Sequence, residues 1–377
     1  MQIKLGDFLR EICIKTVVNN EYPVLTSSKN GIYLQSEYFN KQVASKDNTG
    51  YKIIKKGQFT YRAMSDTGEF YPNMLKCVDV GIVSPAYPVF EITNRDIIYP
   101  QYLQYFFRSN TFRYNISGLE QGSTRTSIKF NKMKNIKIKL PPLLEQKKVI
   151  MILDRVGSLI SKRQEQLKYF DELTKSLFIE MFGDPVKNPF MFEKQRLSKI
   201  GELERGVSKH RPRNAPELLG GKYPLIQTGE ISNSDLYINK FENTYSELGL
   251  SQSKLWKKGT LCITIAANIA KTGILTFDSC FPDSVVGFVP NKLTNNIFIH
   301  YWFSFFQKIL EEEAPESAQK NINLKVLSNL DVIVPPIELQ NKFAAVVAQI
   351  DKSKLAVKKS LEELEILKKS LMQKYFA

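Results

Sequence analysis

Two stretches of the chain carry the hydrophobic spacing of long helices that pack against a partner. Each follows a pair of prolines, Pro141-Pro142 or Pro335-Pro336, and continues for about 39 residues with no further proline. Two series of positions, each spaced by seven residues over five heptads, are mainly apolar, which predicts a coiled coil. The apolar positions of this predicted seam are Val149, Leu153, Val156, Ile160, Leu167, Phe170 and Leu177 in the first stretch, and Phe343, Val347, Ile350, Val357, Leu361, Leu364 and Leu371 in the second.

The two stretches are copies of one another. Residues 133–182 align with residues 327–376 without a gap, at a constant offset. The double prolines coincide, Gln146 falls on Gln340, and Phe182 falls on Phe376. Chance does not produce a gapless match of this length, so the chain is an internal repeat, each half consisting of a variable domain followed by a helix.

A helix of about 39 residues is roughly 58 Å long. The alternative to pairing, an independent core helix in each domain, would leave these helices extending beyond a domain of ordinary size. We therefore expect the two helices to pair. An antiparallel pairing would place the variable domains at opposite ends of a rod, related by a pseudo-twofold axis. The polar seam positions differ between the copies, Arg163 and Thr174 against Lys354 and Lys368, which favours a heterologous pairing over self-association.

The variable domains have the pattern of mixed α/β structure. Short β-rich segments are separated by Gly, Pro and Asn, and one aromatic run in each domain predicts a buried helix. Pro100 suits the first turn of the first of these helices. The predicted strands are 58–61, 81–83, 261–265 and 285–289, and the predicted helices are 99–107 and 298–306. Lys55-Lys56-Gly57 matches Lys257-Lys258-Gly259 across the repeat.

The charge of the chain favours a polyanionic partner. Lys and Arg number 53 against 38 Asp and Glu, which gives a formal net charge of +15, and the excess is positive in each of the four segments of the repeat. Such a spread is expected where nucleic acid lies along a protein and phosphate contacts come from many places.

Several other classes are disfavoured. The longest apolar run, around residues 298–306, is about half of a membrane span, and the amino terminus lacks the apolar stretch of a secretory signal. We expect a cytoplasmic protein without a membrane segment. The four cysteines form no C-x-x-C pair and there are two histidines, so we expect reduced thiols, no metal site and no cofactor. His300 lies in an aromatic run and is expected in the core.

The repeated segments resemble a known family. PPLLEQKKV (residues 141–149), the long helix and LFIEMFGDP (177–185) resemble the central conserved region of type I restriction–modification specificity subunits. PPIELQNKF through SLMQKYF resembles the distal conserved region, although Leu339 stands where the first copy has Glu145. The resemblance implies an α/β (α+β) fold with two target recognition domains, residues 1–140 and 183–334. Two long antiparallel helices, in residues 141–182 and 335–377, would join them.

The resemblance also implies a function. Members of this family are non-catalytic readers of double-stranded DNA, so each recognition domain would read one half of an asymmetric, bipartite target. Two methyltransferase subunits would bind, and motor-nuclease subunits would join the full complex. The outer faces of the helices are the natural docking surface, with Leu144, Phe178, Phe182, Met372 and Phe376 as candidates, although these side chains could instead pack on the recognition domains.

Candidate DNA contacts are loop residues that present paired donors or acceptors to base edges, or charge to phosphates. The most basic loop of the chain, residues 208–216, lies in the second domain, and weaker candidates lie in the loops around the predicted strands and before each Pro-Pro. The candidates are Lys209, Arg211, Arg213, Asn214, Asn268, Lys271, Gln319, Lys320 and Asn321 in the second domain, and Lys29, Asn30, Arg62, Ser123, Thr124, Arg125 and Thr126 in the first.

Three alternatives remain on the sequence alone. An amino-methylating DNA methyltransferase would need a D/N-P-P-Y/F element and a Gly-rich cofactor turn, and the nearest string, at residues 188–190, lacks the second proline. A coiled-coil adaptor that binds no DNA would show no salt-dependent binding to duplex. A specificity subunit of a related system with a fused methyltransferase–nuclease has the same features as the favoured interpretation.

Overall fold

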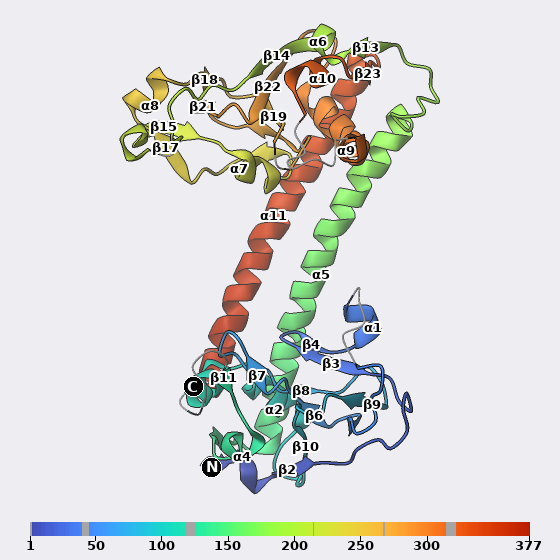
Figure 1. Ribbon diagram of the computed structural model, residues 1–377, viewed down its shortest axis with the longest axis vertical. Helices are drawn as coiled ribbons and strands as arrows, with labels where there is room; N and C mark the ends of the chain where they lie inside the picture. The colour runs from blue at the N-terminus through green and yellow to red at the C-terminus, as the bar shows by residue number, and fades with distance from the viewer. Residues whose placement is uncertain are drawn as a thin grey trace. The chain divides into compact units, whose positions relative to one another are not determined.

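The computed structural model describes residues 2–39, 45–117, 119, 126–213, 215–266, 268–313 and 322–377, with the backbone alone described for 307–313. The chain divides into two compact units (Figure 1). Unit 1 comprises Met1–Gln164 and Lys358–Ala377, and unit 2 comprises Glu165–Val357. Each unit contains one mixed α/β domain together with parts of both long helices.

The domain of unit 1 is built from short antiparallel strands. A four-stranded sheet of order β2-β10-β6-β8 lies beside the pairs β1-β12, β3-β4, β5-β9 and β7-β11. The strands are β1 (Gln2–Lys4), β2 (Leu9–Ile12), β3 (Leu25–Ser28), β4 (Gly31–Leu34), β5 (Lys52–Lys55), β6 (Phe59–Thr60), β7 (Met64–Ser65), β8 (Asn73–Met74), β9 (Val80–Val83), β10 (Val89–Ile92), β11 (Thr126–Ser127) and β12 (Lys137–Lys139). The shorter helical segments are η1 (Leu5–Asp7), α1 (Gln35–Tyr38), α2 (Pro100–Phe106), α3 (Asn110–Ser117) and α4 (Phe130–Met133).

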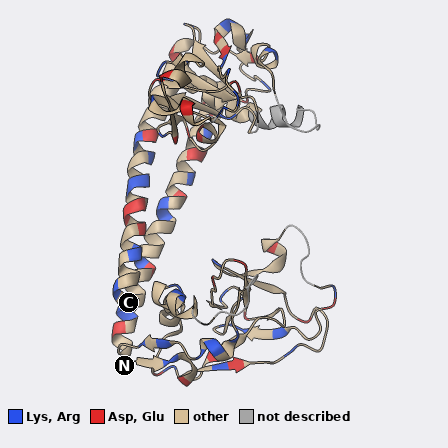
Figure 2. Cartoon of the chain, turned by 60° about the vertical axis from the view of Figure 1, so that its left-hand side comes forward, with Lys and Arg blue, Asp and Glu red and all other residues tan. Residues whose placement is uncertain are grey.

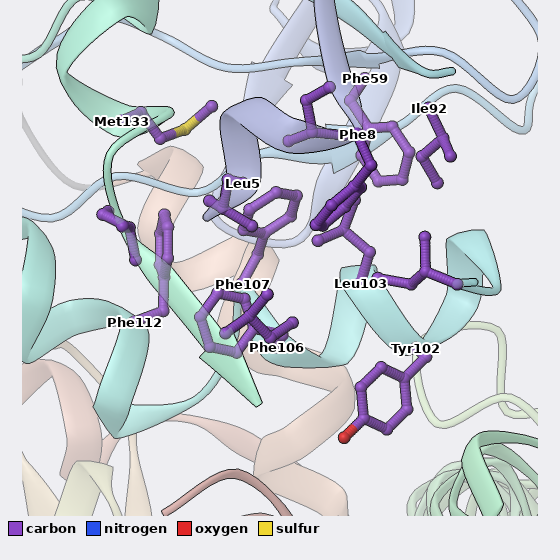
Figure 3. Close-up of a cluster of buried hydrophobic side chains, with 14 of the residues drawn as sticks. Leu5, Phe8, Phe59, Ile92, Tyr102, Leu103, Phe106, Phe107, Phe112 and Met133 are labelled. Atoms are coloured by element: carbon purple, nitrogen blue, oxygen red, sulfur yellow. The ribbon is translucent and has the colours of Figure 1, made fainter. Parts of the chain in front are cut away.

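The core of unit 1 is aromatic (Figure 3). Phe59 of the sheet stacks on Phe90, and Phe107, which follows α2, meets both rings edge-on. Helix α2 begins at Pro100, as expected for a proline at the first helical position, and buries Tyr102, Leu103 and Phe106. The aromatic run 99–107 is therefore a buried helix, as its sequence predicted.

The domain of unit 2 has two larger sheets, of order β14-β22-β19-β20-β16 and β17-β15-β21-β18, and the pair β13-β23. The strands are β13 (Lys194–Arg196), β14 (Gly201–Arg205), β15 (Leu219–Leu225), β16 (Tyr237–Ile238), β17 (Asn243–Tyr245), β18 (Leu255–Trp256), β19 (Leu261–Thr264), β20 (Thr272–Leu275), β21 (Ser279–Cys280), β22 (Val285–Pro290) and β23 (Asp331–Ile333). The shorter helices are α6 (Leu197–Ile200), η2 (Pro216–Leu218), α7 (Thr228–Ser232), α8 (Glu247–Ser251), α9 (Asn296–Glu313) and α10 (Leu324–Ser328). The predicted strands at 261–265 and 285–289 and the predicted helix at 298–306 are confirmed.

The two long helices, α5 (Leu143–Phe182) and α11 (Ile337–Phe376), have 40 residues each. Each begins directly after its double proline. The carbonyl oxygen of Pro142 accepts the N–H groups of Glu145 and Gln146 at 2.9 and 3.0 Å, and that of Pro336 does the same in α11. Helix α5 ends at Phe182, and the next residue, Gly183, has a φ of 71°, the left-handed conformation that favours glycine after a helix.

The helices run antiparallel in each unit. In unit 1, Phe376 at the end of α11 packs on Tyr102, and it shares a core with Val149 and Leu153 near the start of α5. In unit 2, Phe182 at the end of α5 packs on Phe343 near the start of α11. Every apolar residue of the predicted seam is buried or half-buried.

The polar positions of the predicted seam differ in their burial and in their contacts. Thr174 is buried, and its hydroxyl donates to the carbonyl oxygen of Phe170 at 2.9 Å. Lys354 is also buried and pairs with Asp171 at 2.6 Å. Arg163 and Lys368 are half-buried. The charged position in unit 2 thus pairs with the opposite helix, whereas its counterpart by the repeat is the apolar Ile160.

The domains are attached to the helices in the same way. In unit 1, β1 pairs antiparallel with β12 immediately before Pro141-Pro142, and in unit 2, β13 pairs antiparallel with β23 before Pro335-Pro336. The Lys-Lys-Gly segments form equivalent turns, with Gly57 and Gly259 at φ of 85° and 91°. The loose correspondences between the domains therefore reflect one shared scaffold.

One expectation for the outer helix faces is wrong. Phe178 and Phe182 are fully buried in the core of unit 2, and Phe376 is buried in that of unit 1 with Met372 packed beside it. These side chains pack on the domains, the alternative that the sequence left open. Of the proposed docking residues, Leu144 is exposed.

Candidate nucleic-acid interface

The basic loop of unit 2 is organised around Asp283. Arg211 donates from Nη1 to the carbonyl oxygens of Ser208 and His210 at 2.6 and 2.8 Å, and its Nη2 lies 3.3 Å from Asp283 Oδ2. Arg213 forms an ion pair with the other oxygen of Asp283. Two guanidinium groups thus share one carboxylate, and both remain about half exposed. The loop is pre-arranged, and it keeps a net positive charge that faces solvent.

A hollow of about 420 Å³ lies beside this loop. It is lined by Arg213 from the basic loop, by Ala266 from the segment after β19, and by Pro282 and Ser284 on either side of Asp283. The polar side chains of Gln227, Thr228 and Asn243 complete the lining. The structure therefore brings the basic loop and the loop after β19, both predicted from sequence, to one concave surface of unit 2.

Two predicted DNA-contact residues lie on the β19–β20 loop, and each takes part in a hydrogen bond within unit 2. Asn268 is exposed and donates from Nδ2 to Ser232 Oγ at 3.1 Å. Lys271 is half-buried, and its backbone N–H donates to Thr264 Oγ1 at 3.0 Å. Lys209 is exposed, and its backbone N–H donates to Gln252 Oε1 at 2.7 Å.

In unit 1, Lys29 and Asn30 form the exposed turn of the β3–β4 hairpin. Asn73, a buried residue of β8, supports this turn through two hydrogen bonds. Its Nδ2 donates to Ser27 Oγ at 2.9 Å and to the carbonyl oxygen of Ser28 at 2.8 Å. The backbone N–H of Asn30 donates to Ser28 Oγ at 3.1 Å. This hairpin turn is the best-defined of the predicted candidates in unit 1.

The same part of unit 1 contains cations that the sequence analysis missed. Arg108, Arg113 and Lys29 all lie within about 6 Å of the ring of Tyr71. Arg108 directly follows the predicted aromatic helix, and Arg113 belongs to α3. Their proximity to Lys29 is a tertiary contact across 79 or more positions, so no local pattern could have indicated it.

The remaining candidates fall into two groups. Arg62 is exposed beyond β6, and Thr126 lies in β11, where its hydroxyl donates to the carbonyl oxygen of Ser65 at 3.0 Å. The other candidates before each helix, and one in the basic loop, lie outside the described residues. These are Ser123, Thr124, Arg125, Asn214, Gln319, Lys320 and Asn321.

The histidines and cysteines have structural surroundings. His300 is half-buried, its Nδ1 lies 2.8 Å from Thr272 Oγ1, and desolvation lowers its pKa to about 4. It lies at the edge of the core rather than fully inside it. Cys262 and Cys280 are buried, Cys13 and Cys77 are exposed, and all four are free thiols. In the part of the chain that is described, no three His, Cys, Asp or Glu side chains form a group that could hold a metal ion.

Basic residues occur on both units and along both long helices (Figure 2). Among the described residues, none of the helices combines the length and the apolar character that crossing a bilayer requires.

Comparison with known proteins assigns the family. A model of the type I restriction modification DNA specificity domain matches the chain twice, over residues 4–169 and 191–366. The chain belongs to the type I restriction–modification DNA specificity family. The two matches correspond to the two halves of the internal repeat. The protein is accordingly a DNA sequence-specificity subunit, a recognition component without catalytic activity.

Individual relatives have low sequence identity to this chain, but the matches extend over most of it. The chain is 26% identical to the putative type I restriction enzyme MjaX specificity subunit of Methanocaldococcus jannaschii, over 74% of this chain and 68% of that protein. It is 22% identical to the EcoKI specificity subunit of Escherichia coli K12, over 74% of this chain and 65% of that one.

Solved structures share the fold. The S subunit of a type I restriction–modification system from M. genitalium matches with a TM-score of 0.60 at 15% identity, covering 100% of this chain and 96% of that one. A chain from a study of complex assembly and conformational transition of the type I R-M system matches with a TM-score of 0.63 at 19% identity, covering 99% and 96%.

Proposed function

We propose that this specificity subunit reads an asymmetric, bipartite target in double-stranded DNA, with one half-site for each recognition domain. Residues 1–140 form the first recognition domain and residues 183–334 the second. We propose that the helical segments 141–182 and 335–377 set the gap between the half-sites. We place this activity in the cytoplasm.

One observation supports two unlike half-sites. The two units share a scaffold, but the cations that gather on them differ. Unit 1 gathers Lys29, Arg108 and Arg113 around Tyr71, whereas unit 2 gathers Arg211 and Arg213 on the loop beside Asp283. Counted from Tyr99 and Asn295, which occupy equivalent places before the aromatic helices, Arg108 falls on the uncharged Ser304. Because base recognition depends on the side chains presented to the groove, unlike surfaces favour unlike sequences.

The exposed apolar residues of the helices support two methyltransferase docks. Ile152 and Val346 occupy equivalent positions of the repeat and are 40% and 43% exposed. Leu173 and Leu367 are a second equivalent pair, 52% and 45% exposed. Each unit therefore presents one of these side chains from α5 and one from α11. Apolar side chains exposed at matching positions favour protein contacts. We propose that one methyltransferase subunit binds each unit and that motor-nuclease subunits join this assembly for cleavage.

The decisive experiment is to express the chain with its methyltransferase subunit and to map the methylated positions across a host genome. We expect a target with two different specified blocks separated by a gap of constant length. A single contiguous block, a palindrome, or methylation without sequence preference would contradict the proposal.

A further inference from the structure

Three cationic side chains of unit 1 surround one tyrosine ring. The Arg108 guanidinium carbon lies 5.0 Å from the centroid of the Tyr71 ring, that of Arg113 lies at 5.8 Å, and Lys29 Nζ lies at 6.0 Å. At such distances a cation is attracted by the face of an aromatic ring. We call these four residues, together with Glu69, the Tyr71 cluster.

The cluster contains less negative than positive charge. Glu69 accepts a hydrogen bond from the Tyr71 hydroxyl, and its Oε1 lies 4.0 Å from Arg113. Both contacts are at the surface, since Glu69 and Arg113 are about 40% exposed. One carboxylate among three cations leaves a local charge of about +2, which favours the approach of an anion.

The cluster is built on fixed elements. Arg108 donates to Asn73 Oδ1, and the amide nitrogen of Asn73 holds the β3–β4 hairpin that carries Lys29. Asn73 Nδ2 also donates to the carbonyl oxygen of Tyr71 at 2.9 Å. A single buried amide thus connects the hairpin, the tyrosine and the arginine, so the cations are positioned before any ligand binds.

The surroundings of Arg108 are electrostatically unfavourable for its positive charge. Its Nη1 is buried and has no hydrogen-bond partner among the described residues. Its pKa is lowered to about 10, mainly by burial, and the neighbouring charge of Arg113 contributes to this lowering. An anion in front of the cluster would offset both the burial and the repulsion between the arginines.

We propose that Lys29 and Arg113 bind one backbone phosphate of the DNA beside the half-site read by the first recognition domain, with Arg108 adding positive charge next to the Tyr71 ring. This inference rests on the proposed DNA-reading function. A phosphate fits better than a base edge, because the half-buried Arg108 already uses its guanidinium on Asn73. Phosphate contacts position a protein on DNA and carry no direct sequence information.

The test measures binding of the complex of the full chain with its methyltransferase subunit to two duplexes over a range of KCl concentrations. One duplex carries the mapped target and the other is random. We expect Lys29→Ala and Arg113→Ala each to weaken binding to both duplexes by about tenfold near 0.1 M salt. The slope of log K against log salt should become shallower in each variant and by about 0.9, the value for one phosphate, when both residues are replaced, with the ratio of specific to random affinity unchanged.

Two further variants distinguish the loss of a phosphate contact from a loss of binding caused by misfolding. Glu69→Gln removes the negative charge of the cluster, and we expect tighter binding to both duplexes, a change opposite in sign to that of the alanine variants. Arg10→Ala, which removes an exposed cation already paired with Glu91, should leave affinity and slope unchanged.

The outcomes separate this inference from the proposed function. If the wild-type complex shows no sequence-dependent binding, the proposed function fails. A second outcome is that the wild-type complex prefers the target duplex while Lys29→Ala and Arg113→Ala keep the wild-type affinity and salt dependence. In that case the proposed phosphate contact is wrong, and the proposed DNA-reading function stands. Loss of affinity for the target duplex alone would assign the cluster to base reading and would likewise overturn the phosphate assignment.

Discussion

Gln146 and Gln340 make matching hydrogen bonds at the first turns of α5 and α11. Gln146 accepts the N–H of Tyr99 at 3.0 Å and donates to the carbonyl oxygens of Ile97 and Pro141 at 2.8 and 2.9 Å. Gln340 accepts the N–H of Asn295 at 3.3 Å and donates to those of Leu293 and Pro335 at 3.0 and 2.8 Å. Both side chains are completely buried.

These bonds explain why the glutamine is retained in both copies of the Pro-Pro segment. Each amide ties the helix start to the segment that precedes the buried aromatic helix of its domain. The preceding residue has no such role: Glu145 is exposed, whereas its counterpart Leu339 packs against the core of unit 2. The difference between the two motifs at this position therefore leaves the attachment intact.

Replacing either glutamine should destabilise its unit. Gln146→Leu and Gln340→Leu each leave a buried N–H and two buried carbonyl oxygens without partners, and unpaired buried groups cost about 1–3 kcal/mol each. We expect the free energy of unfolding to fall by roughly 2–4 kcal/mol in urea titrations. Gln164→Leu, at an exposed position of α5, is the matched control and should change it by less than about 0.5 kcal/mol. Equal stability of all three variants would contradict this role.

The buried Lys354 should be replaceable by an apolar residue. It pairs with Asp171 at 2.6 Å and lies 3.9 Å from Asp235, and both carboxylates are more than half exposed. When Lys354 is removed they can therefore return to water, and the cost of desolvating the ammonium is avoided. We expect Lys354→Ile, which copies Ile160, to leave the free energy of unfolding within about 1 kcal/mol of wild type or to raise it.

Lys354→Ala provides the contrast, since it also creates a cavity and should cost about 2 kcal/mol. If Lys354→Ile lost as much stability as Lys354→Ala, the ion pair itself would be the stabilising element.

His300 should make unit 2 sensitive to acid. Its pKa is about 4 in the folded protein, mainly because of burial, against about 6.5 in an unfolded chain. Between these values the unfolded state binds more protons, so the free energy of unfolding falls as the pH drops from 6.5 to 4, by up to about 3 kcal/mol.

His300→Gln removes this titration. Denaturant unfolding at pH 7 and pH 5 should show a smaller loss of stability for the variant than for wild type. Parallel losses in the two proteins would show that His300 is protonated as readily in the fold as in water.

Local patterns in the sequence predicted the helices and their attachment, because prolines and heptads act over a few turns. They did not predict which side of each helix its domain would cover. Phe178 and Phe182 lie beside the seam and enter the core of unit 2, which only the tertiary structure reveals. The Tyr71 cluster was missed for the same reason, since Lys29 and Arg108 are far apart in the chain. The basic loop was found because its arginines, Arg211 and Arg213, are only two positions apart.

The exposed apolar pairs should set methyltransferase stoichiometry. Ile152→Glu places a charge on the proposed dock of unit 1, and Val346→Glu does so on that of unit 2. Native mass spectrometry should show two methyltransferase copies for wild type, one for each single variant and none for the double variant. Lys342→Glu, an exposed change on the same helix, should keep two copies. Two copies in the double variant would place the docks elsewhere.

Arg213 should contribute to one half-site alone. An arginine that pairs with a base edge contributes about 1–3 kcal/mol of discrimination. We expect Arg213→Ala to relax base preference at one position of one block in a selection from a duplex library. The other block serves as the internal control, and loss of preference in both would contradict the assignment.

The separation of the two half-sites tests the central claim most directly. Seven residues inserted after Gln164 in α5, with seven more inserted before Lys358 in α11, preserve the heptad pattern and lengthen both helices by about 10.5 Å. Since B-DNA rises about 3.4 Å per base pair, target mapping should then return the same two half-sites with a gap longer by about three base pairs. Altered half-sites, or an unchanged gap in a complex that still methylates, would contradict the account.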